Sequence, residues 1–234
     1  MSHHAMFPPE RLRYLTLLSR QYPTVQAAST EIIRLQAILN LPKGTEHFMS
    51  DIHGEHEAFL HILNSSSGEV KAKLNDLFGD TLSQRERNEL VTLIYYPTEK
   101  LALLADASAD LAEWYRRTID QLVALCRHVS AKHTRMKVHS YMPAEYAHIL
   151  DEMLHLQDDD GMRHSQYDSI IDTIIRIGQA PKVIEAICVV IKALTCDHLH
   201  IVGDIFDRGT RADIVMDSLM PSKNCVRAAI KKSL

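Results

Sequence analysis

The sequence Ile201-Val202-Gly203-Asp204-Ile205-Phe206-Asp207-Arg208-Gly209 decides the fold class, together with a shorter stretch, Asp51-Ile52-His53-Gly54. Each stretch places carboxylate or imidazole groups at the end of a short apolar run. A strand that ends in this way delivers such groups to a cleft. The helical pattern of residues 55–63 follows Gly54 and completes a strand–turn–helix unit, the first half of a βαβ unit. The sequence therefore predicts an α/β fold.

Turn residues and apolar spacing divide the chain into successive segments. We expect N-terminal helices over 1–40, the first strand–turn–helix over 41–64, a helical insertion over 65–196, the second strand and its loop over 197–220, and a basic tail over 221–234. The insertion shows apolar residues at three- and four-residue steps, as in Leu122, Leu125 and Val129, which predicts buried helix faces. Ser83-Gln84-Arg85-Glu86 matches a capping box at the head of one of these helices.

The side chains at the two strand ends are hard oxygen and imidazole donors, which suit manganese, iron or zinc. Two divalent cations held about 3.5–4 Å apart assist phosphate ester hydrolysis by activating water and neutralising developing charge. Simpler interpretations exist: Asp51 as a helix cap beside a surface histidine, Asp204 as a turn carboxylate, and Asp207 with Arg208 as a local ion pair. The presence of both stretches, in this order and at strand ends, favours the metal site.

The two stretches resemble signature segments of the calcineurin-type metallophosphoesterases. The resemblance implies that Asp51 and His53 bind one metal ion and that the carboxylate of Asp204 bridges both ions. It also implies that Asp207 orients a general-acid histidine and that Arg208 binds the substrate phosphate, a role that suits a planar guanidinium. The implied fold is a partial calcineurin-like metallophosphoesterase core with a large, mainly helical insertion.

Other stretches resemble the class 3 fructose-1,6-bisphosphatases of bacteria, from about Tyr14 to Met220. They are Thr30-Glu31-Ile32-Ile33, Leu41-Pro42-Lys43-Gly44-Thr45-Glu46-His47-Phe48, Leu93-Ile94-Tyr95-Tyr96-Pro97 and the segment 201–209. This resemblance implies a Mn²⁺-dependent hydrolase that removes the 1-phosphate of fructose 1,6-bisphosphate, a small sugar bisphosphate, in gluconeogenesis.

The sequence departs from the family after Met220. The residues 221–234 no longer resemble it, and the Gly-Asn-His segment that supplies further metal ligands and the general acid is absent, so we expect a chain truncated on its C-terminal side. Only one metal half-site is then complete. Two alternatives stay open: a non-catalytic remnant that acts as a helical interaction module, and a phosphoesterase that acts on another phosphate ester. The sequence also leaves open whether this chain is itself active.

The composition of the chain limits which binding partners and which cellular compartment we expect. A formal net charge of −4 argues against a general nucleic-acid binder, and no apolar run is long enough for a membrane span. The start of the chain does not resemble a signal peptide, and the four cysteines lack Cys-x-x-Cys spacing, so we expect structural thiols in the cytoplasm. Homo-oligomerisation is left open. We interpret His47, His198 and His200 as neighbours of the site, and Asp158-Asp159-Asp160-Gly161 as a solvated turn.

Overall fold

The computed structural model describes residues 7–105, 111–156, 161–219 and 227–229. The expected turn at 158–160 and most of the basic tail therefore lie outside the described residues. The chain divides into two compact units, residues 1–42 and residues 43–234, and each is described by itself.

The first unit consists of two helices, α1 (Pro9–Gln21) and α2 (Val25–Leu39). Pro9 occupies the first helical position of α1, where its missing N–H removes no hydrogen bond. The Thr24 hydroxyl caps α2 by accepting a hydrogen bond from the Ala27 amide at 3.1 Å. The predicted N-terminal helices are thus confirmed. No side chain of either helix is buried.

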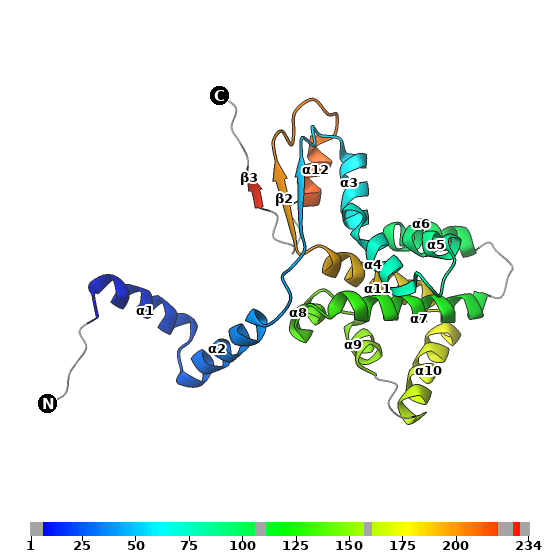
Figure 1. Ribbon diagram of the computed structural model, residues 1–234, viewed down its shortest axis with the longest axis horizontal. Coiled ribbons are helices and arrows are strands. Elements are labelled where there is room, and N and C mark those ends of the chain that lie inside the picture. The colour runs from blue at the N-terminus through cyan, green and yellow to red at the C-terminus, as the bar shows by residue number, and fades with distance from the viewer. Residues whose placement is uncertain (1–6, 106–110, 157–160, 220–226, 230–234) are drawn as a thin grey trace. The chain divides into compact units, whose positions relative to one another are not determined.

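The second unit contains a small parallel sheet in the order β1–β2–β3 (Figure 1). Its strands are β1 (Glu46–Ser50), β2 (His198–Val202) and β3 (Arg227–Ala229). The register of β1 against β2 runs from Glu46 opposite His198 to Ser50 opposite Val202. The structure therefore confirms the α/β class and both predicted strands. It also adds a strand inside the segment that we expected to be a divergent tail. The calcineurin-like core stays a prediction.

One face of the sheet is covered by two helices, α3 (His56–Ser65) and α12 (Ala212–Leu219), as Figure 1 shows beside β2. Together they enclose a small core of buried residues: Ile52, Phe59, Leu199, Ile201, Ile205 and Val215. The alternate residues of the strands point the other way, where Phe48 is 71% exposed and Val202 is 42% exposed. Only one face of the sheet therefore contributes apolar burial among the described residues.

The segment between α3 and β2 is helical, as predicted, and forms a second core. Its helices are α4 (Glu69–Phe78), α5 (Gln84–Tyr95), α6 (Pro97–Ala105), α7 (Leu111–Ser130), α8 (Arg135–Ser140), α9 (Ala147–His155), α10 (Gly161–Arg176) and α11 (Ala180–Thr195), with a short 3₁₀ turn, η1 (Ser66–Gly68), before α4. The predicted face of α7 is buried, with Leu122 and Leu125 each 1% exposed. This face of α7 packs against α11, in which ten residues are buried.

The predicted capping box at the head of α5 is present. The Ser83 hydroxyl accepts a hydrogen bond from the Glu86 amide at 3.3 Å, and the Glu86 carboxylate accepts one from the Ser83 amide at 2.8 Å. These bonds satisfy two backbone donors that the first turn of a helix otherwise leaves unpaired.

We predict that Ser83→Ala lowers the free energy of unfolding by about 1 kcal/mol, because the cap is lost while the helix interior is unchanged. Urea unfolding followed by circular dichroism measures the difference. Arg85→Ala is the matched control in the same helix turn, because the Arg85 side chain is 88% exposed and its ion pair contributes little. Equal stability of Ser83→Ala and Arg85→Ala would contradict the prediction.

The described cysteines agree with the expectation of structural thiols. Cys126 and Cys188 are buried free thiols, and burial raises the pKa of each to about 12. Their thiolate forms are therefore scarce near neutral pH, which makes both side chains chemically inert. None of the helices in the described part of the chain combines the length and the apolar character that crossing a membrane requires.

Candidate metal centre

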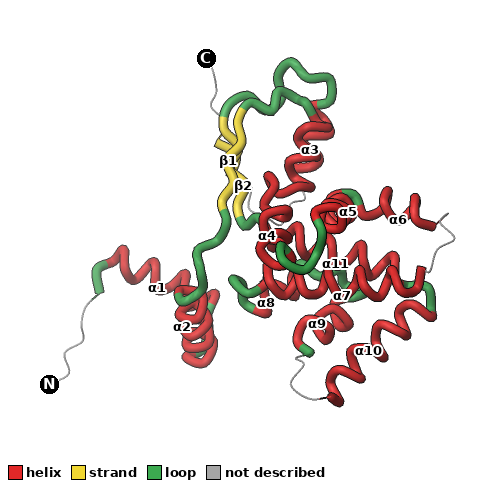
Figure 2. Tube along the Cα trace, turned by 45° about the vertical axis from the view of Figure 1, so that its right-hand side comes forward, coloured by secondary structure: helices red, strands yellow, loops and turns green. Residues whose placement is uncertain are grey.

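The candidate site lies in the two loops that follow β1 and β2. Figure 2 shows these loops in green, together at the end of the strands that points away from helices α7–α10. Backbone hydrogen bonds continue the pairing beyond the strands: the Asp51 amide donates to the Val202 carbonyl at 3.2 Å, and the His53 amide donates to the Asp204 carbonyl at 3.1 Å. The parallel register therefore carries the two motif loops side by side, as the strand–turn–helix pattern predicted.

Glycines allow this close approach. Gly209 lies so near the other loop that an added Cβ would sit 2.6 Å from the Cα of Gly54 and would also overlap the His53 carbonyl. Gly203 has a φ of +84°, and an added Cβ would overlap the Asp51 carboxylate. A side chain at Gly209 would require the backbone to move, whereas a side chain at Gly203 would be strained by the left-handed φ and would displace the Asp51 carboxylate.

Three motif residues adopt left-handed backbone conformations that side chains disfavour: Asp51 at a φ of 53°, His53 at 51° and Arg208 at 65°. Such residues cost about 1–3 kcal/mol each and gather at functional sites, where the surrounding structure holds them. Here the holding residues are Ile52 and Ile205, which are 7% and 5% exposed and anchor the two loops in the small core. Because Ile52 and Ile205 are buried, the polar residues next to them in the sequence face away from the core.

This backbone brings His53, Asp204 and Asp207 together. Each offers one donor atom, and all three atoms lie within 4.8 Å of one another. His53 Nδ1 lies 2.7 Å from Asp207 Oδ1, and because Asp207 is a carboxylate near neutral pH, the ring N–H must be the donor. This hydrogen bond lowers the pKa of Asp207. It also leaves Nε2 of His53 as the ring atom with a free lone pair, the arrangement that metal-binding histidines usually show.

The other two predicted site residues border this group. The Asp51 carboxylate accepts a hydrogen bond from the Asp204 amide at 3.4 Å, so it lies against the Asp204 backbone. Arg208 is 76% exposed, with its Nε 3.2 Å from the Asp207 carboxylate. The structure therefore joins His53 and Asp204 as expected. It also adds Asp207 to the donor group, which the sequence interpretation had reserved for orienting another histidine.

Histidines on the strands stay outside this group in the part of the chain that the structure describes. The His200 ring stacks on Phe48 with centroids 4.6 Å apart, and its Nε2 lies 3.8 Å from the Glu46 carboxylate. His198 is tilted against His200 at 6.4 Å. The structure thus keeps His198 and His200 out of the donor group, but it leaves Nε2 of His47 and of His200 buried without a hydrogen-bond partner, so these two rings are not the satisfied neighbours that we expected. The donors that remain are oxygen and imidazole nitrogen, which fit a hard or borderline divalent cation.

The family model described as Firmicute fructose-1,6-bisphosphatase matches residues 13–226. The chain belongs to this family. It is 52% identical over 210 residues to the class 3 fructose-1,6-bisphosphatase of Clostridium acetobutylicum. The matched segment covers 90% of this chain and 32% of that protein. It is 54% identical over 213 residues to the protein of the same name from Bacteroides fragilis, and this match covers 91% of this chain and 32% of the relative.

These fructose-1,6-bisphosphatases are much longer than the chain, which spans about a third of the length of the curated relatives it matches. No solved structure matches the chain. The family assignment confirms the resemblance that the motifs predicted.

Proposed function

We propose that the loops after β1 and β2 form the first metal half-site of a class 3 fructose-1,6-bisphosphatase. The observation that supports this most is the convergence of His53, Asp204 and Asp207 within 4.8 Å, in a chain 52% identical to proteins of that name. The reaction of the complete site is the hydrolysis of fructose 1,6-bisphosphate to fructose 6-phosphate, in the cytoplasm and in gluconeogenesis. The family assignment favours this substrate over the other phosphate esters that the motif alone allows.

The metal ligands that we propose are His53 through Nε2 and Asp204 through its carboxylate, with Asp51 beside them. The cation is Mn²⁺, which accepts this mixed oxygen and nitrogen set. When bound, divalent cations polarise the phosphate and activate water. The donor chemistry fits such a group, since the described residues at this place are carboxylates and imidazole without a thiolate.

The chain's own residues orient the reaction. Asp207 holds the His53 ring by the 2.7 Å hydrogen bond to Nδ1, so that Nε2 is the ring nitrogen left for the cation. Arg208 remains largely exposed next to Asp207, where its guanidinium can take a phosphate by two parallel hydrogen bonds. The donors of the second half-site and the general acid are proposed to lie in the part of the curated relatives that the match does not cover.

We predict that Asp204→Ala weakens Mn²⁺ binding at least about 100-fold, because it removes a proposed metal ligand. Even the loss of a residue that only hydrogen-bonds to a ligand lowers metal affinity by about 10–100-fold. Isothermal titration calorimetry or the electron paramagnetic resonance signal of free Mn²⁺ measures the affinity. Asp213→Ala is the matched control: its carboxylate lies in the same region, is 63% exposed and pairs with Arg211 outside the donor group. Equal Mn²⁺ affinities of Asp204→Ala and the unchanged chain would overturn the proposal.

Substrate choice is tested by phosphate release with Mn²⁺ from fructose 1,6-bisphosphate, a phosphopeptide and a cyclic nucleotide. We expect release from the sugar bisphosphate alone, and none in Asp204→Ala, because that variant loses a proposed metal ligand. Release from the phosphopeptide or the cyclic nucleotide at an equal or higher rate would contradict the proposed substrate.

A further inference from the structure

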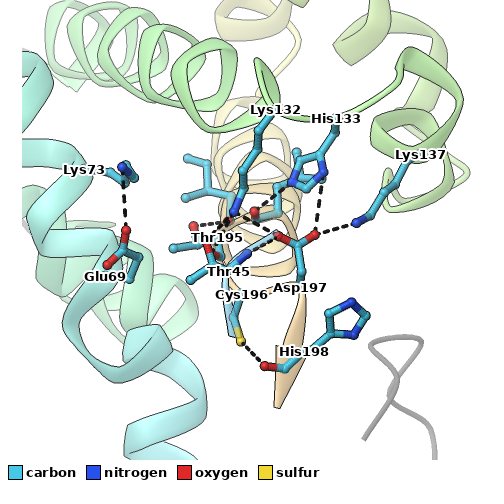
Figure 3. Close-up of polar contacts among 12 residues, drawn as sticks. Thr45, Glu69, Lys73, Lys132, His133, Lys137, Thr195, Cys196, Asp197 and His198 are labelled. Carbon is cyan, nitrogen blue, oxygen red and sulfur yellow. Dashed lines mark hydrogen bonds and ion pairs between the residues drawn. The ribbon is translucent and has the colours of Figure 1, made fainter. Parts of the chain in front are cut away.

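A buried carboxylate sits at the opposite end of the strands from the metal loops. Asp197 connects α11 to β2, and its side chain is only 2% exposed (Figure 3). Isolated buried carboxylates are costly, so a charge at this position must have partners. None of the metal-site residues is among them. The question is therefore what this carboxylate does.

Three basic side chains converge on Asp197, as Figure 3 shows. Lys132 Nζ lies 3.0 Å from Oδ2, Lys137 Nζ donates to Oδ1, and His133 Nδ1 lies 3.6 Å from Oδ1. All three come from the connection between α7 and α8 and from α8 itself. The helical region therefore contacts the residues just before β2 at this carboxylate. We call the residues Thr45, Lys132, His133, Lys137 and Asp197 the Asp197 cluster.

The same carboxylate binds the start of β1. Its Oδ2 accepts a hydrogen bond from the Thr45 amide at 2.9 Å, and the Thr45 carbonyl accepts bonds from the amides of Asp197 and His198 at 3.0 and 3.2 Å. Lys132 also donates to the Thr45 hydroxyl at 2.6 Å. Thr45 and Asp197 are thus held together immediately before the two strands begin to pair.

This contact fixes which residue of β1 faces which residue of β2. From it the register runs to Ser50 opposite Val202, and the next residues are Asp51 and Gly203 in the metal loops. A slip of one residue would turn every side chain of a strand to the other face and would separate Asp51 from the Asp204 amide. Strand β2 buries Leu199 and Ile201, but no residue of the five in β1 is buried, so the apolar contacts of β1 specify its register weakly.

We propose that Asp197 is a positioning residue that sets the register of β1 against β2 and thereby aligns the two loops for metal binding. The metal part of this inference rests on the proposed function. Buried ion clusters add little net stability compared with apolar residues, and their best-attested role is to specify register. The Asp197 cluster has the placement that this role requires. It joins the residues just before both strands and contains none of the proposed metal ligands.

Two variants disturb the cluster in different ways. Asp197→Asn removes the charge. Gly44→Ala keeps the charge, but its added Cβ would sit 3.1 Å from the Cβ, Cγ and Oδ2 of Asp197 and would push the carboxylate away from Thr45. Asp151→Asn is the matched control, because Asp151 is also a mostly buried aspartate, 15% exposed, that pairs with Arg135 and His155 on the helical region only.

The first measurement is amide hydrogen exchange, by mass spectrometry, of residues 46–53 and 198–205. In Asp197→Asn and Gly44→Ala we expect exchange of these segments to accelerate at least about 10-fold more than exchange of α7 and α11 does. The second measurement is Mn²⁺ affinity, which we expect to fall at least about 10-fold in both variants. Asp151→Asn should leave both readouts unchanged.

A purely stabilising role predicts another result: uniformly faster exchange throughout the second unit and an unchanged Mn²⁺ affinity of the folded chain. That result would overturn the inference. If Asp197→Asn does not fold by circular dichroism, Gly44→Ala decides by the same criteria. If the unchanged chain binds no Mn²⁺, the proposed metal site is wrong. The hydrogen exchange of residues 46–53 and 198–205 then decides by itself whether Asp197 sets the register.

Discussion

Gly209→Ala is expected to separate the two metal loops and to reduce Mn²⁺ affinity by on the order of 100-fold. The added Cβ would overlap the His53 carbonyl and lie 2.6 Å from the Gly54 Cα, and backbone atoms cannot rotate away as a flexible side chain can. The loop must therefore move as a whole, which displaces Asp204 and Asp207 from His53. Overpacking of this kind also costs about 1–3 kcal/mol of folding free energy.

Gly178→Ala separates the effect on the site from a general effect of alanine for glycine. Gly178 has a φ of +72°, so alanine is strained there, yet an added Cβ meets nothing within 4 Å. We expect Gly178→Ala to lower the unfolding free energy by about 1 kcal/mol and to leave Mn²⁺ binding intact. Titration calorimetry and urea unfolding on both variants measure the two quantities. Full Mn²⁺ affinity in Gly209→Ala would show that the loops do not need this approach.

Asp197→Asn is expected to lower the unfolding free energy at pH 5 by about 2 kcal/mol, because it removes the buried carboxylate charge that pairs with Lys132 and Lys137. Burial alone would raise the pKa of Asp197, but hydrogen bonds from Lys137, Lys132 and the Thr45 amide outweigh it and lower the pKa from 3.8 to about 2. The folded chain therefore binds this proton more weakly than the unfolded chain does. Ionisation of Asp197 accordingly stabilises the fold above about pH 4, and this contribution is lost as the pH falls towards 2.

The size of that contribution is about 2 kcal/mol, since one pKa unit corresponds to about 1.4 kcal/mol. Urea unfolding of the unchanged chain and of Asp197→Asn between pH 5 and pH 2.5 measures it, and we expect their difference to shrink as the pH falls. Asp213→Asn is the surface control, expected to change stability by less than about 1 kcal/mol because its ion pair with Arg211 is exposed. A difference independent of pH would show that the charge of Asp197 does not support the fold.

Local patterns predicted most of the elements. The apolar steps of α7 and the capping box of α5 depend on residues within a few positions of one another, so the sequence displays them directly. The short strands β1 and β2 were also predicted, because the motif loops mark their ends. Strand β3 was not predicted, since the three residues Arg227–Ala229 carry no alternation of apolar and polar side chains.

The candidate site was predicted in part. The resemblance to the metallophosphoesterase signatures implied that His53 and Asp204 lie in one metal site, and the structure brings them together. The hydrogen bond between His53 and Asp207 joins residues 154 positions apart and depends on the left-handed turns of both loops, which spacing does not reveal. The Asp197 cluster was missed because its signal is one acidic residue in front of an apolar strand, and its partner Lys137 lies 60 positions away.

The sequence by itself determined the residue types of the candidate metal ligands, the helical character of the long insertion and the family, because these depend on residue identity and on spacing along the chain. Only the tertiary structure decided which donors meet and how the strands are aligned. The physical reason is that both outcomes depend on contacts between segments more than a hundred residues apart, such as the packing of Ile52 and Ile205 in the small core and the hydrogen bond from the Thr45 amide to Asp197.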